Sequence, residues 1–227
     1  MSSDPNASPV NPLPPVVVAL AALIFGIEVL FNLGARGLLG GAEAVGWRLS
    51  ALETYAVPGG LQNWMLATGR FSGDNLIRYV TYSFVHVSFT HMLFVVVFVL
   101  ALGKMVGEVF RAWAVLAVFF GASIVGAIVY GLLNERARLI GGYPAVYGLI
   151  GAFTFLLWVN LAAHGANKYR AFTLIAFLLG IQLIFGLFFG GGKDWVADVA
   201  GFATGFGLSF FVCPGGWSHV MAVLRRR

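Results

Sequence analysis

Long apolar stretches separated by short polar connections occupy almost the whole chain. A bilayer core about 30 Å thick requires roughly 20 apolar residues in a helix, and six stretches meet this requirement. They run from about 15 to 33, 79 to 103, 112 to 133, 145 to 163, 171 to 190 and 195 to 213. The pattern therefore predicts an all-α polytopic membrane protein in which six transmembrane helices form one bundle.

The polar residues divide the chain into a head, a membrane domain and a tail. We expect a disordered cytoplasmic head over 1–14, the transmembrane domain over 15–213 and a basic cytoplasmic tail over 214–227. The long first loop, from about 34 to 77, places apolar residues on a helix-like face among charged ones. This loop either lies in the plane of the membrane interface or forms an ordinary solvated loop with a short helix.

Composition agrees with a membrane protein and limits the possible partners. Apolar residues make up 59% and charged residues 10% of the chain, which excludes a soluble globular domain. The net charge of +5 comes from basic residues scattered singly between spans, so we expect no nucleic acid as a partner. The fourteen lysines and arginines divide evenly between the two sides of the membrane, so the positive-inside rule does not set the orientation. The single cysteine, Cys213, excludes an internal disulfide and a cysteine-based metal site, and we expect neither a metal nor a cofactor.

Two histidines mark the segment that opens the second predicted span. His86 and His91 are five residues apart and do not share a helix face, which disfavours a metal pair. The segment resembles the second transmembrane helix of the rhomboid family of intramembrane serine proteases, where a Trp-Arg pair precedes His-x4-His-x3-Asn. Arg78 matches the arginine, Ile77 stands for the tryptophan and Val95 for the asparagine. The resemblance places His91 on the oxyanion side of the site and gives Arg78 and His86 structural roles.

The start of the fourth predicted span has a second rhomboid-like motif. Gly141, Gly142, Tyr143 and Pro144 lie where the family has the Gly-x-Ser-Gly sequence that contains the nucleophile. Tyr143 therefore stands at the position of the catalytic serine. Tyr147 follows four residues later, as a family tyrosine follows the serine, and the resemblance gives it a structural role.

The sixth predicted span has the third motif. Ala197, Asp198, Gly201 and Gly205 match the family pattern Ala-His-x-x-Gly-x-x-x-Gly, with Asp198 at the position of the general base. Small residues four apart let two helices approach closely, and in the family this pattern packs span six against span four. The motif therefore predicts the family packing without the family imidazole.

The resemblance to rhomboids covers about residues 78–210, with the same order and spacing of motifs. Gly103 and Glu108, near the end of span two, resemble the family's Gly-x3-Glu turn with one extra residue, which gives Glu108 a structural role. The resemblance implies a six-helix rhomboid-like bundle with both termini in the cytoplasm. The excess of arginine over lysine and the glycine-rich chain favour a bacterial inner (plasma) membrane.

The replaced residues predict a rhomboid-like pseudoprotease. Tyr143 is a poor acyl acceptor and Asp198 offers a carboxylate instead of an imidazole base. Val95 supplies no hydrogen bond to an oxyanion, and loss of one such donor costs a hydrolase roughly 100- to 1000-fold. We expect the Tyr143 hydroxyl to donate a hydrogen bond to Asp198. By analogy with inactive relatives such as Derlins and iRhoms, the expected partners are transmembrane client proteins and the lipid bilayer.

Two other functions stay open. An active serine protease would need another nucleophile, for which Ser123 is a candidate, although it lies midway along span three and packing between helices is its alternative role. A proton-coupled transporter would use the intramembrane carboxylates Glu28 and Asp198, because such groups are rare and costly in a membrane. The chain has no internal repeat of the kind that many transporters show.

Overall fold

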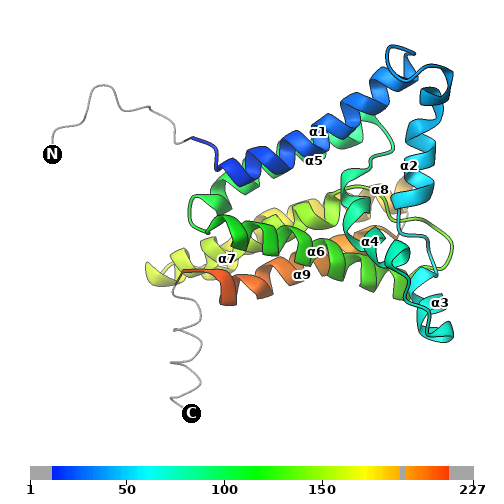
Figure 1. The fold of residues 1–227 in the computed structure, drawn as a ribbon. Coiled ribbons are helices and arrows are strands. Elements are labelled where there is room, and N and C mark those ends of the chain that lie inside the picture. The colour runs from blue at the N-terminus through cyan, green and yellow to red at the C-terminus, as the bar shows by residue number, and fades with distance from the viewer. Residues whose placement is uncertain (1–11, 190–192, 215–227) are drawn as a thin grey trace, which may run out of the picture.

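The computed structural model describes residues 12–189 and 193–214, and the regular elements in those ranges are all helices. Five helices are long and apolar enough to cross a membrane (Figure 1). They are α1 (Pro15–Ala35), α5 (Phe89–Gly107), α6 (Ala112–Leu133), α7 (Tyr143–Ala163) and α9 (Trp195–Val212). The predicted all-α membrane bundle is thereby confirmed. The expected head and tail lie almost entirely outside the described residues.

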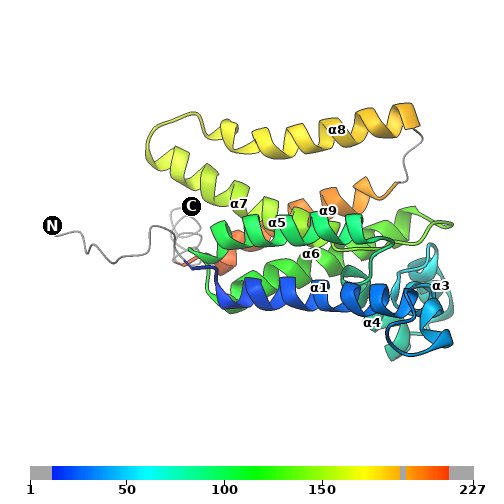
Figure 2. The same cartoon turned by 90° about the horizontal axis from the view of Figure 1, so that it is seen from above.

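The fifth predicted span corresponds to a slightly shorter helix, α8 (Thr173–Phe189), of 17 residues. It follows the short helix η3 (Lys168–Phe172) and lies at the edge of the bundle, on the side opposite α1 (Figure 2). Ile175 of α8 is buried in the core. Four large apolar residues at helical spacing on α8 are exposed: Phe177, Ile181, Ile184 and Phe188. One side of this edge helix is therefore left for lipid or for another helix.

The second predicted span begins ten residues too early. The segment from 79 to 88 is the end of α4 (Gly73–Thr81), a short helix η2 (Tyr82–Phe84) and an extended connection, and α5 begins only at Phe89. Ser88 caps α5, because its hydroxyl accepts a hydrogen bond from the backbone N–H of His91 at 3.2 Å. An apolar run that contains such a cap is read as one span by hydropathy alone, which explains the error.

The first loop folds into short helices at one end of the bundle (Figure 1). These are η1 (Ala42–Gly46), α2 (Trp47–Tyr55), α3 (Leu61–Thr68) and α4. Arg78 of α4 joins α4 to the end of α2, because its Nη1 donates to the carbonyl oxygens of Glu53 and Ala56, both at 2.9 Å. These contacts agree with the structural role that the family resemblance gives Arg78. We call this the loop end of the bundle; α1 begins and α9 ends at the opposite end.

Helices α7 and α9 touch along their backbones. A Cβ atom added to Gly201 would overlap the carbonyl oxygen of Pro144, and one added to Gly205 would overlap that of Gly148. From the other side, a Cβ at Gly151 would overlap the carbonyl oxygen of Phe202. Gly201 and Gly205 thus face span four, as the small-residue spacing predicts. This seam fixes the relative position of the two helices on which Tyr143 and Asp198 lie.

Candidate functional site

The start of α7 is placed by backbone contacts at the loop end. Gly141 has φ +92° and its N–H donates to the carbonyl oxygen of Tyr82 at 3.0 Å. A side chain at Gly141 would be strained, and its Cβ would lie 2.6 Å from Nε2 of His91. Pro144 follows in the first turn of α7, where its missing N–H is no loss. The glycine and the proline together place Tyr143 against the histidines.

His86 fastens the start of α7 to the loop that precedes α5. Its side chain is buried and Nε2 accepts a hydrogen bond from the backbone N–H of Gly142 at 3.3 Å. The proton of the neutral ring is then on Nδ1, which is buried without a protein partner. Burial and the neighbouring His91 lower the pKa of His86 to about 3. His86 is therefore uncharged at neutral pH and acts as a hydrogen-bond acceptor.

His91 lies between His86 and Tyr143. The rings of His86 and His91 meet edge to face with their centroids 5.0 Å apart. The Tyr143 ring stacks on His91, also with centroids 5.0 Å apart and an interplanar angle of 18°. Nε2 of His91 is buried and has no hydrogen-bond partner among the residues that the structure describes. The family resemblance places His91 on the oxyanion side of the site. Tyr143 thus covers one face of this histidine ring.

Asp198 has a partner that the sequence reasoning missed. Its carboxylate is buried and Oδ2 accepts a hydrogen bond from Nε2 of Gln182 at 2.7 Å. The Tyr147 hydroxyl donates to Oε1 of the same amide at 3.2 Å. The predicted hydrogen bond from Tyr143 to Asp198 is wrong: the donor to Asp198 is Gln182, and the Tyr143 ring stacks on His91 instead. One sequence signal was available, since Gln182 is the single amide in the otherwise apolar helix α8.

The Gln182 amide therefore connects three helices of the bundle. Tyr147 belongs to α7, Gln182 to α8 and Asp198 to α9. We call these three residues the amide bridge. A buried carboxylate is tolerated in such a place when its oxygens are hydrogen-bonded, so the bridge satisfies Asp198 and attaches α8 at the same time.

The remaining motif residues are on α5. Val95 is buried, and a Cβ atom added to Gly142 would lie 2.8 Å from its Cγ1. An apolar side chain thus lies where the family has its amide donor. Glu108 is exposed at the C-terminal cap of α5, and no side-chain partner for it is found among the described residues. Gly103 lies against Val17 of α1.

Glu28 forms a buried ion pair with a residue of the first loop. The Arg48 guanidinium donates to both carboxylate oxygens, with Nη2 to Oε1 at 2.6 Å and Nη1 to Oε2 at 2.9 Å. Nδ2 of Asn32 donates to Oε1 at 2.8 Å, and Nη1 of Arg48 also donates to the carbonyl oxygen of His86 at 2.8 Å. We call this group the loop clamp, because it joins α1, α2 and the histidine segment. Both intramembrane carboxylates considered for proton transport are therefore hydrogen-bonded to other side chains.

Ser123 is engaged in helix packing. Its hydroxyl donates to the carbonyl oxygen of Phe119 at 2.9 Å and accepts from the Ser83 hydroxyl at 3.0 Å. In the ranges that the structure covers, no serine hydroxyl hydrogen-bonds to a histidine ring or to a carboxylate. Within the same ranges, no group of three or more His, Cys, Asp or Glu side chains is placed to hold a metal ion.

Comparison with known proteins places this chain in a family. The chain matches the Rhomboid domain over residues 73–215. It is 28% identical to Rhomboid-like protease 3 of Toxoplasma gondii over 138 residues, 61% of this chain and 52% of that protein. It is 26% identical to RHOMBOID-like protein 4 of Arabidopsis thaliana over 138 residues, 61% of this chain and 34% of the relative.

A shorter match is to RHOMBOID-like protein 1 of Arabidopsis thaliana, 32% identical over 85 residues, 37% of this chain and 21% of the relative. The chain thus spans about half or less of the length of these relatives. The Rhomboid domain match covers more than half of the chain, from α4 to the end of α9. This multi-pass membrane protein belongs to the rhomboid family.

Proposed function

We propose that this protein is a rhomboid-like pseudoprotease that binds transmembrane segments of client proteins without cleaving them. The arrangement of Tyr143 and Asp198 carries the proposal. The family resemblance assigns these positions to the nucleophile and the base, yet Tyr143 stacks on His91 while Asp198 is hydrogen-bonded to Gln182. A nucleophile must be hydrogen-bonded to the group that takes its proton, and this pair is not.

The surroundings of the site support the same proposal. Val95 offers no donor to a developing oxyanion, and absence of one such donor lowers the rate of a hydrolase roughly 100- to 1000-fold. Nε2 of His91 is free of partners, but the stacked Tyr143 ring covers its face. Among the described residues, the Ser123 hydroxyl hydrogen-bonds only to the Ser83 hydroxyl and a backbone carbonyl, which disfavours it as a replacement nucleophile.

Client binding is supported by the exposed side of α8. This helix is at the edge of the bundle (Figure 2). Its exposed large apolar residues run from Phe177 to Phe188. α5 also exposes Leu93 and Val97. Transmembrane helices associate by close packing and polar contacts rather than by hydrophobic burial. A client helix between α5 and α8 would pack on these side chains with Gln182 nearby.

We place the protein in a bacterial inner membrane with both termini in the cytoplasm and the loop end outside. The start of α1 and the end of α9 lie at the same end of the bundle, which supports termini on one side (Figure 1). In a Cys213→Ser background, Arg70→Cys should react with a membrane-impermeant maleimide in intact cells. Reaction only after the cells are opened would reverse the orientation.

Chemical labelling tests the absence of proteolytic chemistry. We expect no adduct when the protein in lipid nanodiscs is treated with a fluorophosphonate probe, whereas an active rhomboid protease treated in parallel is labelled. A covalent adduct that disappears in the Ser123→Ala variant would instead establish an active protease with that serine as nucleophile.

Site-directed crosslinking tests client binding. A photoreactive residue is placed at Ile181 of α8 in native membranes, and the control is Leu23 on the opposite side of the bundle, which is also exposed. We expect adducts at Ile181 that contain membrane-spanning peptides of other proteins and few at Leu23. Equal yields from the two positions would contradict a binding surface at α8.

A further inference from the structure

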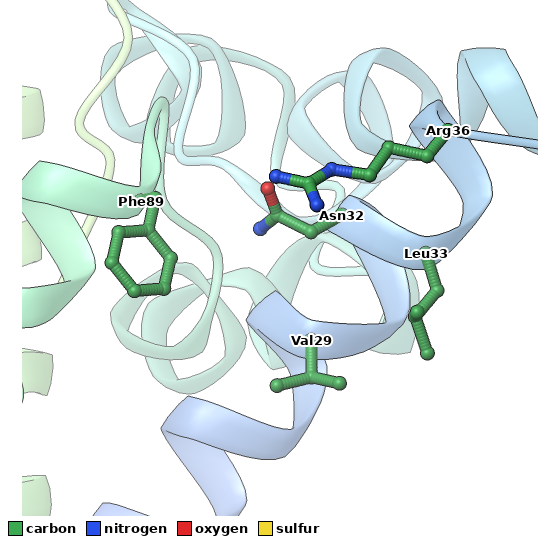
Figure 3. A pocket seen from close by; sticks show the side chains of 5 residues that line it. All are labelled: Val29, Asn32, Leu33, Arg36 and Phe89. Atoms are coloured by element: carbon green, nitrogen blue, oxygen red, sulfur yellow. The ribbon is translucent and has the colours of Figure 1, made fainter. Parts of the chain in front are cut away.

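An open pocket of about 340 Å³ lies between the end of α1 and the start of α5. Val29, Asn32 and Leu33 of α1, Arg36 at its C-terminal cap and Phe89 of α5 line the pocket (Figure 3). Figure 3 shows the Arg36 side chain running back along α1 past Asn32, on the side that faces Phe89. The pocket is on the outside of the bundle, at the loop end.

One wall of the pocket is polar and carries a free positive charge. Arg36 is exposed, and no carboxylate pairs with it in the part of the chain that the structure describes. The nearest carboxylate along α1, Glu28, is already neutralised by Arg48. Nδ2 of Asn32 donates to the backbone carbonyl and to Oε1 of Glu28, both at 2.8 Å, so only its side-chain oxygen is left as an acceptor.

The other wall is apolar and faces the membrane. Val29, Leu33 and Phe89 form it, and Phe89 is 46% exposed. Two other apolar side chains of α1 near the pocket, Phe25 and Leu30, are also exposed. Because the pocket lies where two membrane spans end, its charged side is at the level of lipid head groups and its apolar side borders the acyl chains.

We propose that this pocket binds an anionic phospholipid from the surrounding bilayer. The Arg36 guanidinium contacts the phosphate through paired N–H groups, and the beginning of one acyl chain lies against Val29, Leu33 and Phe89. An amphiphile accounts for both walls, whereas inorganic phosphate would use only the cation. A zwitterionic lipid would bring a second positive charge to Arg36, which forms no ion pair among the described residues.

Lipid titration of the full chain tests the site. The purified protein is titrated with phosphatidylglycerol or with phosphatidylcholine of identical acyl chains, and bound lipids are counted by native mass spectrometry. One basic residue near a membrane surface strengthens anionic lipid binding about fivefold, so we expect phosphatidylglycerol to bind about fivefold more tightly. Arg36→Gln removes this preference. Arg70→Gln retains it, because Arg70 is an exposed first-loop arginine outside the pocket.

Two further variants separate the two walls. Leu33→Gln should weaken both lipids, and Arg36→Lys should keep part of the preference for phosphatidylglycerol, which also provides a folded variant if Arg36→Gln is unstable. Equal affinity of the wild-type protein for the two lipids would overturn the proposal, as would an equal loss of preference in Arg70→Gln. If inorganic phosphate displaces phosphatidylglycerol and Leu33→Gln has no effect, the pocket is a phosphate site and not a lipid site.

Discussion

The seam between α7 and α9 and the attachment of α8 hold helices together in opposite ways. Along the seam, glycines bring the backbones into contact, with Gly205 against Gly148 and Gly151 against Phe202. α8 lies at the edge and is connected to the same two helices through the Gln182 amide. In a lipid environment two apolar helices gain little from burial, so each pair needs close packing or a polar contact. The small-residue seam joins α7 to α9, and the Asp198 carboxylate of α9 attaches the edge helix through Gln182.

The loop clamp is the strongest polar contact to break. Arg48→Ala leaves the Glu28 carboxylate buried and unpaired, which typically costs about 3 to 5 kcal/mol. We expect the largest loss in the free energy of unfolding among the variants considered, measured by denaturant unfolding in micelles. The double variant Glu28→Leu with Arg48→Leu should recover much of it. A double variant no more stable than Arg48→Ala would contradict a penalty from an unpaired charge.

The seam predicts a contrast between two glycines of α9. A Cβ at Gly205 would overlap Gly148, whereas one at Gly207 would meet nothing within 4 Å. Gly205→Ala should therefore lower stability by up to about 3 kcal/mol, the usual range for overpacking, and Gly207→Ala should be neutral or slightly stabilising. Gly201→Val should be destabilising for the same reason as Gly205→Ala. Thermal unfolding measures all three, and a silent Gly205→Ala would show that α7 and α9 are not in backbone contact.

The amide bridge predicts that α8 loosens without Gln182. Gln182→Leu leaves the Asp198 carboxylate without its donor, and an unsatisfied buried polar group costs about 2 kcal/mol. Hydrogen exchange in the loop between α7 and α8 should rise. In the Gln182→Leu background, Asp198→Leu should lower the free energy of unfolding by less than it does in the wild-type protein. A double-mutant cycle measures this difference. Additive effects would mean that the two side chains do not interact.

Arg78 and Arg70 provide a matched pair in the first loop. Arg78 donates to two loop carbonyls, while the side chain of Arg70 forms no hydrogen bond or ion pair within the described residues. Arg78→Ala should cost about 2 kcal/mol, the usual range for hydrogen bonds of a charged group, and Arg70→Ala should be close to neutral. Equal melting temperatures of the two variants would contradict the role assigned to Arg78.

The smallest expected effect is a loss of stability in weak acid, which we attribute to His86. Its pKa is about 3 in the folded protein and 6.5 when unperturbed, so the unfolded chain binds the proton more readily. The contribution of His86 is therefore present above pH 6.5 and is lost as the pH falls from 6.5 toward 3. Between pH 7 and pH 5.5 the loss is about 1 kcal/mol by proton linkage. The His86→Gln variant should lose less over this interval, and parallel curves would remove His86 as the cause.

Much of the fold could be predicted, because span length and small-residue spacing are local signals. Five predicted spans agree with long helices to within a few residues at most of their ends, and the glycines of α9 face α7. The predicted start of α5 was wrong because Ser88 caps the helix within an apolar run. Local patterns detect neither a cap inside an apolar run nor the residue across the bundle that a polar group faces.

The partners in the site depend on tertiary contacts. The sequence identifies Glu28 and Asp198 as intramembrane carboxylates. Their partners are distant along the chain: Arg48 is 20 residues from Glu28, and Gln182 is 16 residues from Asp198. Nothing in the local pattern of either segment specifies these pairs. A hydrogen bond from Tyr143 to Asp198 was expected because the family brings those positions together. The stacking of Tyr143 on His91 depends on the backbone path of Gly141 and Gly142.

Cleavage of a transmembrane substrate tests the central claim most directly. The wild-type protein and the Tyr143→Ser, Asp198→His double variant are reconstituted in liposomes with a rhomboid substrate, and products are identified by mass spectrometry beside an active rhomboid protease. We predict no cleavage by the wild type and no robust cleavage by the double variant, because Val95 still supplies no oxyanion donor and Pro144 still constrains the backbone at position 143. Cleavage within the membrane segment by the wild-type protein would contradict the account.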